Sequence, residues 1–137
     1  MPPRSRLRRG SAAVEMALLL PLLGLLFVFS VDFARLYYQY SIVTNCARNG
    51  ALYLSDPTSA PESPYANVTA AALADASNLS PTPTVTYNSN AFDSSGNPCV
   101  QVTVVYPFTT ITNYPGFPNP INLTRTVQMR LSPATPN

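Results

Sequence analysis

Glu15 is the residue most open to a chemical role, because it is a single carboxylate within an otherwise apolar stretch. A charged side chain at the centre of a membrane helix costs roughly 2.5–3.5 kcal/mol, and less toward the interface. Cleavage after Gly10 would free the amine of Ser11, which is largely cationic at neutral pH and lies one helical turn from Glu15. The spacing favours an ion pair, within one subunit or between neighbours. The alternative is that Glu15 only reaches back to the cytoplasmic interface.

The composition and motifs of the chain give little support for catalysis or for a bound cofactor. The chain has no histidine, lysine or tryptophan, no phosphate-binding glycine motif and no acid pair at a suggestive spacing. Two widely separated cysteines without histidine make a poor zinc site. We therefore expect no enzyme, metal, cofactor or small-molecule substrate. Four of the eight arginines lie in the first nine residues, so no basic face is left for a nucleic-acid partner.

The element that must position Glu15 is an apolar helix over residues 11–31. Apart from Glu15 the segment is uncharged, and its length matches the ~20 residues that span a membrane. Four arginines precede the segment, whereas the charges of Asp32 and Arg35 after it sum to zero. Because positively charged flanks stay in the cytoplasm, we expect the N-terminus to be cytoplasmic. A secretory signal peptide has a shorter apolar core and a small-residue cleavage site. An uncleaved signal anchor is the stronger alternative.

The apolar segment contains two residues that suit packing among other helices. Pro21 removes an amide donor and should bend the helix, and Gly24 should let another backbone approach. Apolar residues at spacings of three and four continue the helix outside the membrane over residues 32–54. From Ser11 to Leu54 it would be about 66 Å long. Gly50 within it predicts either a close-packing point or an early end of the helix.

The remaining residues, 55–137, predict a small α+β ectodomain. After a proline-rich linker, we expect a short helix over residues 67–77 with Asn67 as its cap, and then three strands. The strands are expected at about 84–88, 99–106 and 122–131. The exported half of the long helix would cover the apolar face of this antiparallel sheet. A proline-rich loop, 107–120, carries Tyr114 and Phe117 near its tip and is a candidate contact surface.

Cys46 on the long helix and Cys99 at a strand start are both expected outside the cytoplasm, where oxidation is permitted. A disulfide between them would tie the helix to the sheet and contribute about 4 kcal/mol on the chain-entropy model. The alternative is a pair of buried free thiols.

The N-terminal residues resemble those of a known family. Arg-Arg-Gly10 followed by Ser-Ala-Ala-Val-Glu15 looks like the site of type IV prepilin peptidases, which cut after a glycine and favour glutamate at the fifth mature position. Residues 9–23, 32–38 and 46–53 are similar to the TadE-like family of Tad (tight adherence, or Flp) pilus proteins. Met16 departs from the aromatic residue that usually follows the glutamate, and Asn49 is compatible with the family pattern.

The resemblance implies a single-pass protein of the bacterial inner membrane with a pilin-like long N-terminal helix packed on the sheet. Residues 1–10 would form a cytoplasmic leader, and the C-terminal domain would be periplasmic or extracellular. The implied function is that of a minor pseudopilin in assembly of a Tad/Flp type IVb pilus, processed after Gly10. Implied partners are the membrane, a prepilin peptidase, other pilins and pseudopilins, and the inner-membrane pilus machinery. An uncleaved TadG-like anchored protein and a tethered adhesin are the alternatives.

Overall fold

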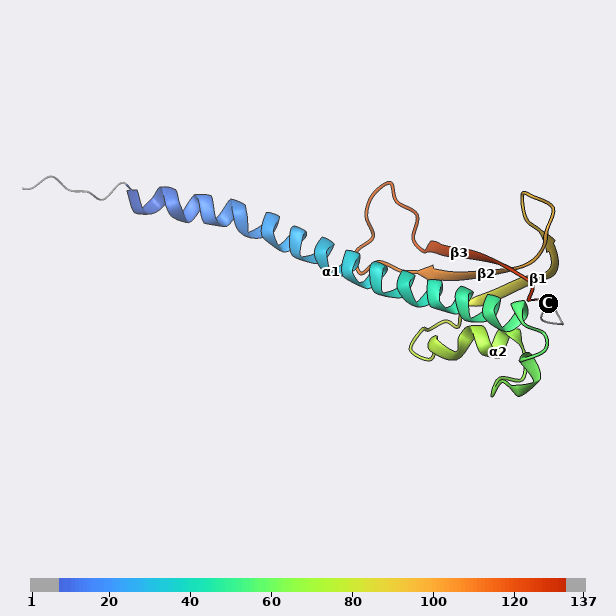
Figure 1. Cartoon of the computed structure of the whole chain (residues 1–137). Coiled ribbons are helices and arrows are strands. Elements are labelled where there is room, and N and C mark those ends of the chain that lie inside the picture. The colour runs from blue at the N-terminus through green and yellow to red at the C-terminus, as the bar shows by residue number, and fades with distance from the viewer. Residues whose placement is uncertain (1–7, 133–137) are drawn as a thin grey trace, which may run out of the picture. The chain divides into compact units, whose positions relative to one another are not determined.

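One helix, α1 (Arg8–Ser55), accounts for the N-terminal part of the chain in the computed structural model, which describes residues 8–132 (Figure 1). The leader expected over residues 1–10 therefore lies mostly outside the described residues, and α1 begins before the expected Ser11. The chain divides into two units, one ending at Arg35 and the other beginning at Leu36. Helix α1 contributes to both.

The described part of the first unit is helix alone, with its apolar side chains outward. Leu18 is 73% exposed and Phe27 is 70% exposed, and the other large apolar side chains nearby are similarly uncovered. Among the described residues, α1 is the one helix long and apolar enough to cross a membrane. Such a surface requires lipid or other helices around it. At the end of this unit, Arg35 pairs with Asp32 one turn earlier, at 3.2 Å.

The second unit contains a three-stranded antiparallel sheet in the order β1-β2-β3. The strands are β1 (Thr84–Phe92), β2 (Pro98–Phe108) and β3 (Ile121–Arg130). All three extend beyond or shift from the expected ranges, and a bulge interrupts β1 between Asn88 and Ala91. Pro107 lies beyond the last residue of β2 that pairs with β1, Val105, and is paired only with Asn122 of β3.

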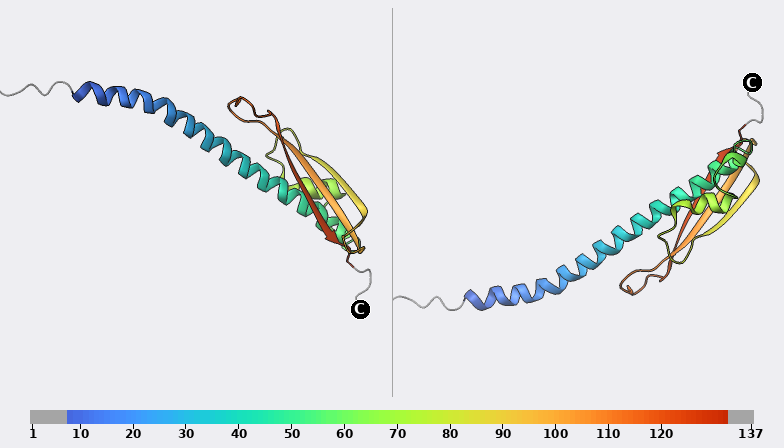
Figure 2. Two further views of the ribbon diagram at one scale, coloured as in Figure 1. Left: turned by 90° about the horizontal axis from the view of Figure 1, so that it is seen from above. Right: turned by 90° about the horizontal axis from the view of Figure 1, so that it is seen from below.

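The core lies between one face of the sheet and the part of α1 from Leu36 onward. Val100, Val102, Val104, Tyr106 and Phe108 alternate along β2, and all are buried. Strand alternation places them on one face, because successive side chains point to opposite sides. Figure 2 shows from two sides that the strands run along the C-terminal part of α1. The α+β fold class is thereby confirmed: a long N-terminal helix packs on a three-stranded antiparallel sheet.

A second, short helix completes the cover of the core. It comprises α2 (Val68–Ala72) and a 3-10 turn, η2 (Leu73–Asp75), within the expected range of 67–77. Asn67 caps α2, since its side-chain oxygen accepts a hydrogen bond of 2.8 Å from the Ala70 amide. The linker before it contains another 3-10 turn, η1 (Ala60–Glu62).

At Gly50, α1 approaches both α2 and the sheet closely. A Cβ at this position would lie 3.1 Å from both the Ala72 Cβ and a methyl of Val102. The helix does not end at Gly50, so the glycine is a close-packing point, which was one of the two expectations from the sequence. The helix continues to Ser55, whose carbonyl accepts a 2.7 Å hydrogen bond from the Ser132 amide.

Candidate functional site

The candidate processing site lies in the first turns of α1. Gly10 and Ser11 are helical and exposed, and a Cβ at Gly10 would meet nothing within 4 Å. The Ser11 hydroxyl donates a hydrogen bond of 3.1 Å to the Glu15 carboxylate. The structure therefore brings two of the three expected residues into direct contact, with Gly10 immediately before them. This arrangement is an accessible peptide bond beside a carboxylate.

Pro21 and Gly24 lie further along the same helix. Pro21 sits within α1, which continues through it. A Cβ at Gly24 would also meet nothing within 4 Å. In the part of the chain that the structure describes, no close packing accounts for this glycine, in contrast to Gly50.

The two cysteines are both buried and both free. Cys46 belongs to the core between helix and sheet, together with Val102 and Val104. Cys99 precedes Val100 on β2 and, by strand alternation, points to the opposite face. There its sulfur accepts a hydrogen bond of 3.1 Å from the Gln128 side chain. The structure does not contain the expected Cys46–Cys99 bridge. Strand alternation places the Cys99 side chain on the face of β2 away from the core that contains Cys46.

Burial determines the chemistry of the Cys46 thiol. Loss of hydration raises its pKa to about 11, and the nearby Asp75 carboxylate contributes in the same direction. The thiolate is the reactive form of cysteine, so this thiol is unreactive at neutral pH.

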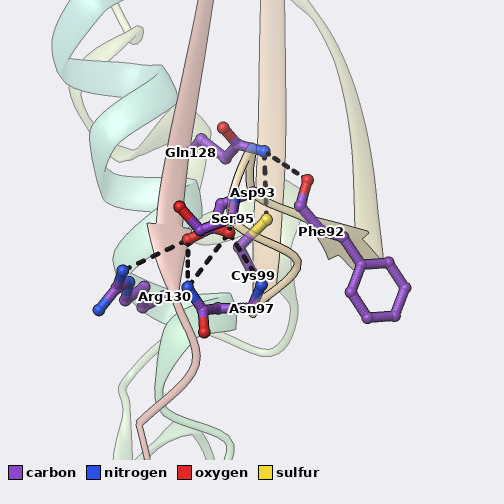
Figure 3. A network of polar contacts seen from close by, with 7 residues as sticks. All are labelled: Phe92, Asp93, Ser95, Asn97, Cys99, Gln128 and Arg130. Atoms are coloured by element: carbon purple, nitrogen blue, oxygen red, sulfur yellow. Dashed lines mark hydrogen bonds and ion pairs between the residues drawn. The ribbon is translucent and has the colours of Figure 1, made fainter.

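A polar network closes the β1–β2 turn, as Figure 3 shows. The Asp93 carboxylate accepts hydrogen bonds from the Ser95 and Asn97 amides, both at 2.8 Å, and from the Asn97 side chain. Arg130 on β3 approaches the same carboxylate at 3.4 Å. The Asn97 bonds lower the pKa of Asp93 more than the Arg130 charge does. The network pins the turn to the neighbouring strand and has the character of a structural clamp.

A cavity of about 330 Å³ lies where the end of α1 meets the linker and α2. Leu52, Tyr53 and Tyr65 contribute apolar lining, and the Asn49 amide donates to Asp75 at its edge, at 2.9 Å. Among the described residues there is no group of three or more side chains that could hold a metal ion. Sequence reasoning missed this cavity, because part of its wall comes from a linker without periodicity.

Sequence reasoning also missed a contact between α1 and β3. The Arg125 guanidinium donates a hydrogen bond of 3.2 Å to the Tyr40 hydroxyl and lies 5.9 Å from the centre of its ring. The signal was present in the alternation of β3, since position 125 shares the face of Leu123 and Val127. Because this face of β3 packs toward α1, a charged side chain on it is expected to contact a polar group of the helix.

Comparison with known proteins concerns the helix. Residues 10–52 match the model of a family described as TadE-like protein. The matched segment begins at Gly10 and includes Glu15, Pro21, Gly24 and Cys46, and it leaves α2 and the sheet outside. No curated protein and no solved structure matches the chain. The resemblance to the TadE-like family is thereby confirmed over the long helix.

Proposed function

We propose that this chain, with its TadE-like segment in residues 10–52, is a minor pseudopilin that takes part in assembling a Tad/Flp type IVb pilus. One observation carries the proposal. The residues that match the family form one uninterrupted helix, and the large apolar side chains of its first half, such as Leu18 and Phe27, are mostly exposed. The family match supports the coarser statement, a membrane-anchored protein associated with the Tad pilus.

The first half of α1 is proposed to be the membrane anchor over residues 11–31. At 1.5 Å per residue this segment is about 31 Å long, which equals the thickness of the hydrocarbon core of a bilayer. The arginines before Gly10 would hold the N-terminus in the cytoplasm, and the sheet would be exported. The buried core of the second unit uses residues from Ile42 onward, so the anchor is not needed for that core.

Processing after Gly10 is supported by the local backbone. The first four amides of a helix have no partner within it, and glycine weakens a helix by about 1 kcal/mol relative to alanine. Unwinding the first turn of α1 to present the Gly10–Ser11 peptide bond to a prepilin peptidase would therefore cost little. Hydrolysis would add water across this bond, releasing residues 1–10 and the amine of Ser11.

The freed amine gives Glu15 its proposed role. Because the Ser11 hydroxyl already reaches the Glu15 carboxylate at 3.1 Å, an amine on the same residue is within reach of that carboxylate. Pairing between neighbouring subunits would hold parallel helices at one axial register. Pro21 and Gly24 are proposed to serve the same assembly, since Gly24 leaves an open place for the backbone of another helix.

The partners proposed from this role are a prepilin peptidase, other pilins and pseudopilins, and the inner-membrane pilus machinery with its secretion ATPase. The test is deletion of the gene, followed by complementation with the wild-type chain and with Gly10→Val, which should block cleavage. Surface pili are counted by electron microscopy. We expect pili to be lost on deletion, restored by the wild type and not restored by Gly10→Val, although that variant is found in the membrane fraction.

Two other outcomes would contradict the assembly role. Normal pili after deletion, with normal attachment of cells, would remove any role in the pilus. Normal pili with lost attachment would instead identify a tethered adhesin.

A further inference from the structure

The loop between β2 and β3, residues 109–120, has an exposed apolar tip. Phe117 is 70% exposed, and the tip is a defined turn in which the Phe117 amide donates to the Tyr114 carbonyl at 3.2 Å. Gly116 has a φ of 86°, which is the conformation that the third residue of a type II turn requires after Pro115. The turn therefore presents Phe117 at a fixed place. Figure 1 shows the loop at the end of the sheet opposite the β1–β2 turn.

Two contacts between β3 and α1 show near which end of the segment from Leu36 to Ser55 this loop lies. The Ser132 amide bonds the Ser55 carbonyl, and Arg125 bonds the Tyr40 hydroxyl. The strand from Arg125 to Ser132 is about 23 Å long at ~3.3 Å per residue, and the helix from Tyr40 to Ser55 is about 22 Å at 1.5 Å per residue. The two lengths agree, so β3 runs parallel to this part of α1.

The start of β3 lies beside the part of α1 that precedes Tyr40. Ile121 lies about 13 Å beyond Arg125, whereas Leu36, the first residue of this unit, lies about 6 Å beyond Tyr40. The loop that precedes Ile121 is therefore at the end where α1 enters the unit. Only a few residues separate Leu36 from residue 31, the proposed end of the membrane anchor. The chain thus delivers this end of the unit to the membrane surface.

The composition of the loop suits a lipid interface. No charged residue lies between Asp93 and Arg125 in the sequence, so no ion would need to lose its hydration. Pro115, Pro118 and Pro120 have no amide hydrogen, which leaves fewer backbone donors to be desolvated. Aromatic side chains are enriched where headgroups meet acyl chains. On α1 itself, Tyr37 is 68% exposed at the same end.

We propose that loop 109–120 is a second membrane contact, with Phe117 inserted among the headgroups of the leaflet from which α1 emerges. The occupant of this surface is lipid, and the proposal rests on anchoring of the chain by residues 11–31. Two attachment points, the helix and the loop, would restrict rotation and tilt of the exported unit. Incoming subunits would then meet it in one orientation.

The chain lacks tryptophan, so one introduced tryptophan reports on a single place. The test compares Phe117→Trp with Phe92→Trp in the full chain, reconstituted in vesicles of phosphatidylethanolamine and phosphatidylglycerol. Phe92 is a matched control, because it is 68% exposed and lies at the opposite end of the sheet. Flotation of the vesicles first establishes anchoring. Fluorescence quenching is then measured with lipids brominated near the headgroup end and with aqueous acrylamide.

We expect emission of Phe117→Trp at shorter wavelength than that of Phe92→Trp, with quenching by brominated lipid several-fold stronger and quenching by acrylamide several-fold weaker. A chain that floats with the vesicles but shows equal quenching of both variants contradicts the loop contact and leaves anchoring intact. Shielding from acrylamide without quenching by brominated lipid indicates a protein neighbour and also overturns the proposal. A chain that does not float contradicts anchoring and the loop contact together.

Discussion

Gly50 on α1 faces Val102 on β2 so closely that a Cβ on the glycine would lie 3.1 Å from a valine methyl. Val102 is fully buried at the centre of the sheet, and Ala72 closes the same gap from α2. The helix gives up about 1 kcal/mol of propensity at Gly50 relative to alanine. The absence of a side chain at Gly50 allows α1, α2 and β2 to pack closely around this position.

Gly50→Val should destabilise the second unit, because branched methyl groups have no space between Val102 and Ala72. Overpacking of a core costs about 1–3 kcal/mol, and valine adds a whole side chain. The free energy of unfolding is measured on the full chain in detergent by urea titration, with tyrosine fluorescence as the signal. Gly24→Val is the matched control, since a Cβ there meets nothing within 4 Å. Equal effects of the two substitutions would refute the packing explanation.

Much of this fold follows from periodicity. Spacings of three and four continue α1 past the apolar segment, and the alternation of Val100, Val102 and Val104 indicates which face of β2 is buried. The same alternation implies that Cys99 points away from the helix. A Cys46–Cys99 bridge would require the Cys99 side chain on the face of β2 that the helix covers.

Other features depend on contacts that sequence patterns do not encode. The bulge between Asn88 and Ala91 depends on the register in which β1 pairs with β2. The hydrogen bond between Asn49 and Asp75 joins residues 26 positions apart in the chain. The Ser11–Glu15 contact, in contrast, follows from helical spacing alone. The candidate processing site was therefore accessible from sequence, whereas the cavity beside α2 was not.

Both thiols should be free in the purified chain. Alkylation after unfolding without reductant is expected to add two groups by mass, whereas a single added group is expected for Cys46→Ala. Unmodified chains that react only after reduction would instead establish a disulfide. In the folded chain, Cys46 should react slowly at neutral pH, because burial raises its pKa to about 11.

The same pKa gives the sign of a pH effect on stability. The Cys46 thiol ionises near pH 9 in an unfolded chain and near 11 in the folded chain, so the folded state retains the proton over that interval. Stability should therefore be unaffected by this group below about pH 8.5 and fall as the pH rises from there toward 11. Urea titrations of wild type and Cys46→Ala across this range measure the difference. A wild type that is no more sensitive to alkaline pH than the variant would contradict the assignment.

Asp93 provides an effect of the opposite sign. Hydrogen bonds from Asn97 hold its pKa below the usual value, so its contribution to stability is present above about pH 4 and lost as the pH falls through the lower folded value. Carbon-detected NMR titration of the carboxyl measures this pKa directly. Asn97→Ala should move the pKa toward that of a free aspartate, more than Arg130→Ala does. The reverse order would mean that the Arg130 charge dominates.

Glu15→Gln should impair pilus assembly without affecting membrane insertion. Glutamine preserves the shape of the side chain but cannot form an ion pair with the freed amine of Ser11. Surface pili and the amount of chain in the membrane fraction are measured in the same cells. Glu15→Asp is the companion variant, because it keeps the charge while shortening the reach. Pili in normal number with glutamine would exclude a role for the ion pair.

Processing after Gly10 is tested by measuring the intact mass of the mature chain. The chain is purified from membranes of cells that contain the Tad prepilin peptidase, beside the Gly10→Val variant. We expect the wild-type mass to be that of a chain that begins at Ser11. The mass of the variant should be that of a chain that keeps residues 1–10. A wild-type chain that retains the leader in those cells would contradict the pseudopilin role and leave an uncleaved membrane anchor.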